Sequence, residues 1–218
     1  TAVSELNLRG LATNARIMWD RVGPEVEPFS PENLLIFGTG LLAGTPAPGC
    51  NRTIVSCISP QTELMAFSMM GGFWGPELKH AGYDKIIFSN KSPDLVYLWI
   101  KDDKVEIRDA SDLWGKDVYE TVDALTGEGK NKPKILCIGP AGENRVRFAC
   151  VCADLGHIAA HNGVGAVMGS KKLKAIVVER GKKSIPVKLG QDLSDLAGTF
   201  RKNLKNDKFL SQVNAWGT

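Results

Sequence analysis

The stretch His161-Asn162-Gly163-Val164-Gly165-Ala166-Val167-Met168-Gly169-Ser170-Lys171-Lys172 stands directly before an apolar run, 173–178, which is typical of a buried β-strand. Glycines allow a backbone with positive φ and let a ligand approach the peptide groups closely. Exposed N–H groups in such a loop form a concave surface that attracts anions. We therefore expect a loop that binds phosphate through its backbone, with a plain turn as the alternative. Gly163 and Gly165 should occupy positions that a Cβ atom would block.

Two familiar phosphate-binding motifs do not fit this stretch. The dinucleotide fingerprint Gly-x-Gly-x-x-Gly follows a strand and begins a helix. Here the third glycine, Gly169, comes one residue too late, and residues 152–160 predict helix or loop rather than strand. A P-loop requires Gly-Lys-Ser/Thr, which the sequence lacks.

The composition is that of a globular protein, with 218 residues, 43% hydrophobic and 23% charged. The 27 basic and 24 acidic residues are mixed along the chain and predict no nucleic-acid partner. No apolar run reaches the roughly 18 residues of a membrane span, and we expect no signal peptide. The five cysteines include no Cys-x-x-Cys, which favours reduced thiols in a cytoplasmic protein over metal ligation.

The hydrophobic pattern predicts short strands alternating with short helices. Helices are expected over 12–22, 76–81 and 113–125, with an exposed helical tail over 189–210. Strands are expected over 34–37, 53–58, 83–89, 134–138, 145–152 and 173–178, with a hairpin formed by 96–100 and 105–108. Loops rich in glycine or proline connect them at 38–49, 71–75 and 139–144.

The order of these elements repeats once. Residues 34–38, a Gly/Pro loop and Arg52 resemble residues 135–139, a second Gly/Pro loop and Arg145. The stretch 75–88 likewise resembles 169–178. This repetition predicts a pseudo-two-fold domain with two equivalent loops near one axis, which would suit two similar ligand moieties.

The most specific motif in the chain is Gly163-Val164-Gly165-Ala166-Val167-Met168-Gly169-Ser170-Lys171 with residues 173–176. It is accompanied, in order, by 31–37, 40–45 with Arg52, 71–75, 81–84 and 105–110. Together these segments resemble, over about residues 8–180, the N-terminal domain of the aldehyde:ferredoxin oxidoreductase family of tungsten–pterin enzymes. Residues 52–56, 59–62 and 65–74 are most similar to one branch, the tungsten subunit of class II benzoyl-CoA reductases.

The resemblance implies an α+β fold with mixed β-sheets, pseudo-two-fold internal duplication and short helices. Residues 1–185 would form a base for a tungsten (or molybdenum) bis-pterin, with magnesium between the two pterin phosphates. Residues 186–218 would form a polar helical tail that leads to a second domain outside this chain. Such further domains would bind a [4Fe–4S] cluster, because the family's Cys-x-x-Cys-x-x-x-Cys motif does not occur here.

The same resemblance implies particular cofactor-binding residues but no catalytic residue. Arg52 would lie between a pterin and the cluster, a role that suits a fixed charge with five N–H donors. The remaining residues belong to a first loop, Met69, Met70, Gly71 and Gly72, and a second loop, Ala159, Ala160, His161, Asn162, Gly163 and Gly165. The backbone carbonyl of Ala159 would bind magnesium, a hard cation that prefers oxygen ligands.

Two departures from the family pattern affect these loops. Met69 stands where the family has an asparagine that binds magnesium, so water or a backbone oxygen would have to replace that contact. His161-Asn162-Gly163 replaces Arg-Gly-Gly, which removes one phosphate contact that His161 could restore as a donor. Asn162 tolerates positive φ and would keep the shape of the loop. His157 and His80 carry no signal that separates them from packed or surface histidines.

Two classes of function therefore stay open. As part of an intact enzyme, the domain would serve aldehyde oxidation to a carboxylic acid with ferredoxin as electron acceptor, or an aryl-CoA (benzoyl-CoA-type) reductase. Its partners would be the remaining domains, ferredoxin or an iron–sulfur subunit, and further copies in a homo-oligomer, and this piece alone would be inactive. The second class is a non-catalytic orphan domain that acts as a scaffold. The departures at Met69 and His161 and the absent cysteines count in its favour, but the resemblance makes the enzyme domain the main expectation.

Overall fold

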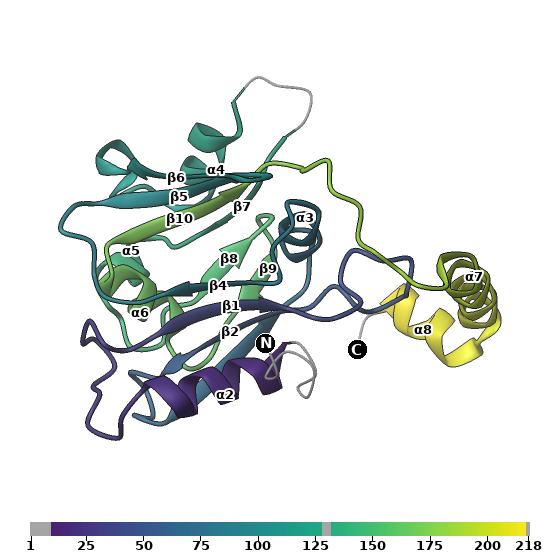
Figure 1. Ribbon diagram of the computed structural model, residues 1–218, viewed down its shortest axis with the longest axis horizontal. Helices are drawn as coiled ribbons and strands as arrows, with labels where there is room; N and C mark the ends of the chain where they lie inside the picture. The colour runs from purple at the N-terminus through teal and green to yellow at the C-terminus, as the bar shows by residue number, and fades with distance from the viewer. Residues whose placement is uncertain (1–9, 128–131, 217–218) are drawn as a thin grey trace.

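The computed structural model describes residues 10–127 and 132–216, so 1–9 of the expected base and 217–218 of the expected tail lie outside the described residues. The described chain forms two β-sheets with short helices, an α+β arrangement (Figure 1). The strands are β1 Leu35–Thr39, β2 Thr53–Ile58, β3 Met65–Met70, β4 Lys85–Phe88, β5 Val96–Lys101, β6 Lys104–Asp109, β7 Lys134–Cys137, β8 Val151–Ala153, β9 His157–Ala159 and β10 Leu173–Val178. The helices are α2 Leu11–Arg21, α3 Trp74–His80, α4 Val118–Thr126, α5 Pro140–Glu143, α6 Val164–Ser170, α7 Gly190–Asn206 and α8 Lys208–Trp216, with a 3₁₀ turn at Ser111–Leu113.

The same topology occurs twice. The first sheet has the strand order β3-β2-β1-β4, and the second contains β9-β8-β7-β10, with β5 and β6 added beyond β10. Neighbours within each set of four pair antiparallel. The added strand β5 pairs parallel with β10. The duplication predicted from the sequence is therefore confirmed in the order and pairing of the strands.

The equivalent strands β3 and β9 form the facing edges of the two sheets and contact each other. Across both sheets the order is β4-β1-β2-β3 and then β9-β8-β7-β10, which a two-fold axis between β3 and β9 would produce. We call this contact the seam. The loops that follow β3 and β9 both begin at the seam, so the duplication brings equivalent loops together.

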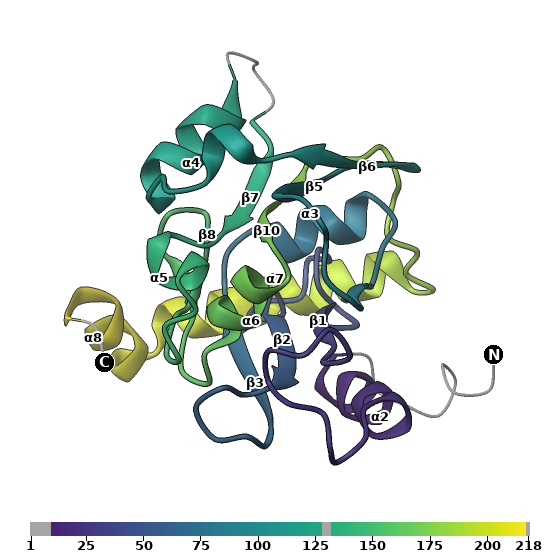
Figure 2. The same ribbon diagram turned by 90° about the vertical axis from the view of Figure 1, so that its left-hand side faces the viewer.

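Helices separate and cover the sheets. α3 and α6 lie between the two sheets and contact both (Figure 1). Residues of both sheets and both helices share one hydrophobic core, in which Phe37, Trp74 and Met168 are fully buried. The indole N–H of Trp74 donates to Ile176 O at 3.1 Å and so joins α3 to β10. α2 and α4 cover the outer faces of the first and second sheets, on opposite sides of the molecule (Figure 2).

A buried ion pair fixes β10 to α5. The Lys174 side chain is fully buried, and its Nζ donates to the Glu143 carboxylate and, at 2.8 Å, to Lys116 O. Glu143 also accepts the N–H of Gly115 at 2.9 Å. A buried charge requires such partners. The pair therefore holds α5, β10 and the turn before α4 in one arrangement.

Three predictions about the second half of the chain are wrong. Residues 145–150, expected as strand, form turns, and only Val151–Ala153 are extended. Residues 152–160, expected as helix or loop, contain the hairpin of β8 and β9. Residues 164–170, expected as part of a glycine loop, form α6. In each case long-range pairing or packing overrides the local propensity.

The other predicted elements are present with shifted ends. The helix expected over 113–125 begins at Val118, because Asp117 and Glu120 form a capping box there. The helix expected over 76–81 begins at Trp74, and the loop expected over 139–144 contains α5.

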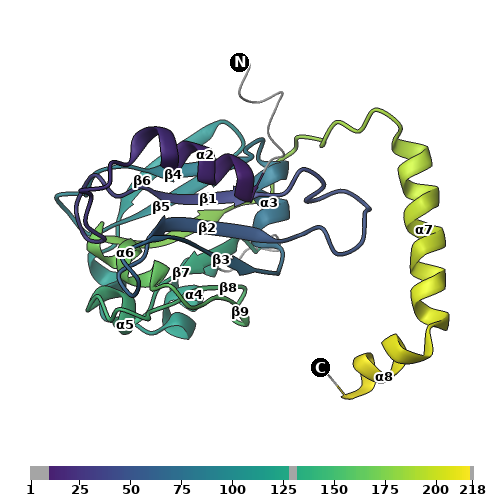
Figure 3. The same cartoon turned by 90° about the horizontal axis from the view of Figure 1, so that it is seen from below.

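The C-terminal helices α7 and α8 form an arm beside the layered body (Figure 3). Arg201 Nη1 of α7 donates to Pro46 O at 3.2 Å, in the loop between β1 and β2. Several large apolar side chains of the arm are exposed, among them Leu196, Phe200, Phe209 and Trp216.

Candidate functional site

Two loops at the seam contain five of the eleven predicted site residues. The first loop (residues 71–73) follows β3 and precedes α3, and the second loop (residues 161–163) follows β9 and precedes α6. They are equivalent in the duplicated topology, as the sequence repetition predicted.

The first loop rests on the second half of the molecule. The backbone N–H of Phe73 donates to Asp154 Oδ2 at 2.7 Å. Gly72 has φ 85°, and a Cβ built on it would lie 2.6 Å from His157 Cδ2. Glycine is thus required here for both conformation and space, and the side chain that approaches it is His157.

The second loop rests on the first half. Asn162 Nδ2 donates to Phe67 O of β3 at 2.9 Å. His161, Asn162 and Gly163 have φ values of 58°, 52° and 65°. A Cβ on Gly163 would lie 2.0 Å from Arg147 O, so this position also requires glycine. Asn162 adopts the left-handed conformation that its residue type was expected to tolerate.

Arg52 and His157 line one pocket beside the first loop. The pocket has a volume of about 280 Å³ and is completed by Gly49, Asn51 and Gly71. Arg52 is exposed, and no salt bridge reaches it in the part of the chain that the structure describes. An unpaired guanidinium suits a phosphate or carboxylate. The sequence predicted Arg52 and Gly71 as site residues but not His157. Only the position of His157 on β9 could have indicated its role, and that strand was not predicted.

An apolar strip lies next to these loops. Alternate side chains of β3 point outward, and Met65, Phe67 and Met69 are 40%, 42% and 49% exposed. Ile158 of β9 is also exposed. Apolar surface beside a few convergent polar groups is typical of sites for organic cofactors. The two glycine-containing loops, the unpaired Arg52 and this strip fit a planar ring ligand that carries phosphate.

Four of the predicted site residues lie inside the fold: Met70, Ala159, Gly163 and Gly165. Met70 and Ala159 are buried. Gly165 lies within α6, where a Cβ would come within 2.2 Å of Cys150 O, so protein occupies the clearance that a ligand was expected to use. Only backbone atoms of these residues could contact a ligand. Ala160 and Asn162 are partly exposed and His161 is exposed, at the surface of the second loop.

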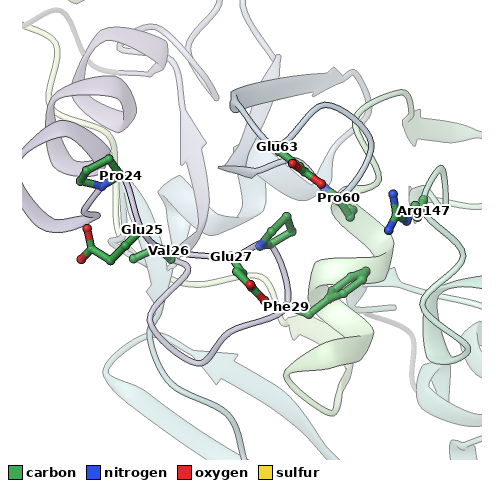
Figure 4. Close-up of a pocket in the computed structure, with 9 residues that line it drawn as sticks. Pro24, Glu25, Val26, Glu27, Phe29, Pro60, Glu63 and Arg147 are labelled. Atoms are coloured by element: carbon green, nitrogen blue, oxygen red, sulfur yellow. The ribbon is translucent and has the colours of Figure 1, made fainter.

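A larger pocket, of about 370 Å³, lies behind the second loop and is less suited to an anion (Figure 4). Glu25, Glu27 and Glu63 surround it, together with Phe29 and Arg147. Three carboxylates repel a phosphate, and one arginine does not balance them. The Arg52 pocket is therefore the better candidate despite its smaller volume.

No group of three or more His, Cys, Asp or Glu side chains within residues 10–127 and 132–216 could hold a metal ion. Cys57, Cys137 and Cys152 are buried as free thiols, and Cys50 and Cys150 are partly buried. Burial raises the pKa of Cys57 and of Cys137 to about 12, so both stay protonated at neutral pH.

Comparison with known proteins identifies the family. Residues 2–180 match the family described as aldehyde ferredoxin oxidoreductase, N-terminal domain. The chain therefore belongs to the aldehyde ferredoxin oxidoreductase family. The resemblance seen in the sequence, and the α+β fold that it implied, are both confirmed.

Relatives in the aldehyde ferredoxin oxidoreductase family extend the match. The chain is 55% identical over 165 residues to the tungsten-containing aldehyde ferredoxin oxidoreductase of Pyrococcus abyssi, covering 75% of this chain and 27% of the relative. The corresponding enzyme of Thermococcus kodakarensis is 47% identical over 203 residues, covering 93% of this chain and 33% of the relative. The solved active site complex BamBC of benzoyl coenzyme A reductase, in complex with 1,5 dienoyl-CoA, is 57% identical with a TM-score of 0.89, covering 94% of this chain and 31% of that chain.

The chain thus spans about a third of the length of the relatives it matches. Within the described residues, none of the helices is both long enough and apolar enough to cross a membrane.

Proposed function

We propose that this chain is the cofactor-binding base domain of a tungsten (or molybdenum) bis-pterin oxidoreductase. The observation that carries the proposal is the pair of equivalent loops at the seam, beside the unpaired Arg52 and the exposed apolar strip of β3. The tungsten-containing relatives support the identity of the metal.

The residues of this chain would bind and orient the cofactor. The two loops would hold the two pterin phosphates through backbone N–H groups, and Arg52 and His157 would donate to the moiety at the first loop. Met69 and Phe67 would lie against the pterin rings. The Ala159 carbonyl would be this chain's oxygen ligand for magnesium, because the Met69 thioether is a poor ligand for that ion. The bound cofactor would supply two-electron transfer at its metal.

Further domains of the full-length protein would hold a [4Fe–4S] cluster, and ferredoxin or a partner subunit would serve as electron acceptor. Two substrate classes follow from the relatives. Aldehydes are indicated by the enzymes of Pyrococcus abyssi and Thermococcus kodakarensis. An aryl-CoA thioester is indicated by the benzoyl coenzyme A reductase complex, which is 57% identical over 94% of this chain. Turnover of each class by the full-length protein distinguishes them.

The cofactor role is tested by Arg52→Ala in the full-length protein, with Arg21→Ala as a matched control on α2. Both arginines are exposed, so both variants should fold. We expect Arg52→Ala to lower turnover or to shift the potential of the cluster, and Arg21→Ala to change neither. Wild-type activity and an unchanged redox titration in Arg52→Ala would count against the proposal.

Elemental analysis of the folded full-length protein tests the alternative role as a scaffold. Stoichiometric tungsten or molybdenum after gel filtration supports the cofactor role. A folded protein from a tungsten-supplied host that carries neither metal would instead support a non-catalytic scaffold.

A further inference from the structure

A third pocket is lined by a buried amine, that of Lys171, which the proposed cofactor role does not use. It has a volume of about 280 Å³ and lies where the connection from β4 to β5 passes over the second sheet. Its walls are largely apolar, with Lys171 among them. The lining residues are Phe88, Ser89, Asn90, Lys91, Ser92, Pro93, Val96, Tyr97, Leu98, Ile107, Lys171 and Leu173.

The Lys171 side chain is held by backbone carbonyls alone. Lys171 is 4% exposed, and its Nζ donates to Asn90 O at 2.9 Å and to Pro31 O at 3.2 Å. In the described chain no carboxylate pairs with it. Lys174, three residues further on in β10, differs in this respect, because its Nζ is paired with the Glu143 carboxylate.

This environment suits a neutral amine. A neutral amine has two N–H groups, which match the two carbonyl acceptors, and one lone pair that is left free. Burial lowers the pKa of Lys171 to about 8, and the groups that oppose this shift are Cys57 and Glu32. Cys57 is uncharged at neutral pH because burial raises its pKa to about 12. With a pKa of about 8, roughly a tenth of Lys171 is the neutral, nucleophilic amine at pH 7, far more than of an ordinary lysine.

We propose that this pocket binds small apolar aldehydes and holds them as an imine with Lys171. The lone pair of Nζ attacks the carbonyl carbon, and the carbonyl oxygen takes up a proton to give a carbinolamine. Loss of that hydroxyl group as water, with the second amine proton, leaves the C=N bond. The step requires no oxidant or reductant, and hydrolysis reverses it. The apolar walls formed by Phe88, Val96 and Leu98 favour an aldehyde with an aromatic or aliphatic group over a charged one.

The test traps the imine in the full-length protein with benzaldehyde and cyanoborohydride at neutral pH, followed by peptide mapping. Lys85 is the internal control, because burial lowers its pKa also to about 8 but it does not line this pocket. If the pocket binds the aldehyde, Lys171 should carry about ten times as much benzyl adduct as Lys85. Equal labelling of the two lysines, or labelling of Lys91 with Lys171 unmodified, would overturn the proposal.

Two further measurements separate a binding site from a merely reactive amine. Labelling of Lys171 should saturate with aldehyde concentration, and benzyl alcohol, which fits the pocket but forms no imine, should suppress it. Ser89→Trp adds bulk at the exposed rim of the pocket and leaves the hydrogen bonds of Lys171 in place. This variant should reduce the labelling of Lys171 at least as strongly as benzyl alcohol does. Labelling that rises linearly with concentration and ignores both the alcohol and the tryptophan would refute the site.

Discussion

Replacing Gly165 by alanine should destabilise the fold, although alanine is the better helix former. Gly165 lies in α6, and a Cβ there would stand 2.2 Å from Cys150 O and 2.7 Å from Cys150 C. These are backbone atoms, which cannot turn aside as the end of a side chain can. α6 must therefore move away from the segment before β8, or that segment must move.

The magnitude follows from three terms. Overpacking of a buried contact costs about 1–3 kcal/mol. The bond from Gly165 N to Ala149 O, 2.9 Å long, would be stretched by the same displacement, at a cost of about 1 kcal/mol. The higher helix propensity of alanine returns about 1 kcal/mol. The net loss in the free energy of unfolding should be about 1–3 kcal/mol.

Gly198 provides the matched control, because it also lies in a helix, α7, but has nothing within 4 Å of a built Cβ. Gly198→Ala should leave stability unchanged or raise it by about 0.5–1 kcal/mol. Urea denaturation followed by circular dichroism and tryptophan fluorescence measures both variants. If Gly165→Ala is as stable as the wild type, the packing argument for α6 is wrong.

Three other predictions concern buried or strained polar groups. Glu143→Gln leaves Lys174 buried without its carboxylate and should cost about 3–5 kcal/mol in urea denaturation, part of which Lys174→Met should restore in the double variant. Asn162→Ala should cost about 1 kcal/mol more than Asn162→Gly, because both lose the bond to Phe67 O but only alanine is strained at φ 52°; equal losses would refute the strain. The unfolded state binds more protons than the folded state between pH of about 8 and 10.5, where folded Lys171 has already deprotonated. Stability should therefore rise with pH across this window, and Lys171→Met should lower that slope by about 1.4 kcal/mol per pH unit.

The sequence predicted β1, β2, β4, β7 and β10 as strands, because their apolar runs are continuous. It predicted no strand at β3, and helix or loop at β9. It failed for α6, since glycine at 165 and 169 argues against a helix. The structure shows why glycine is there: a Cβ on Gly169 would lie 2.0 Å from Gly142 O, and one on Gly165 would lie 2.2 Å from Cys150 O. Close packing of α6 against α5 and against the segment before β8 favours the helix here. Local helix propensity does not include such long-range contacts.

The site was predicted only in part, for a related reason. Arg52 and Gly71 are separated by one hairpin and could be connected through the family motif. His157 belongs to a three-residue strand, too short for an alternating pattern, and it reaches the first loop only because β9 meets β3 at the seam. The apolar strip of β3 was not predicted, because no strand was expected over 65–70.

The way in which each loop is anchored has a consequence for how the site responds to change. The first loop is held by Asp154 of the second half, and the second loop by Phe67 of the first. Neither loop carries its own support, so the gap between them is set by how the two sheets pack through their common core. A smaller side chain in that core, for example in Leu136→Ala, would change the distance between the two loops. The binding of two linked ligands of fixed size should therefore weaken in such a variant even while the protein remains folded.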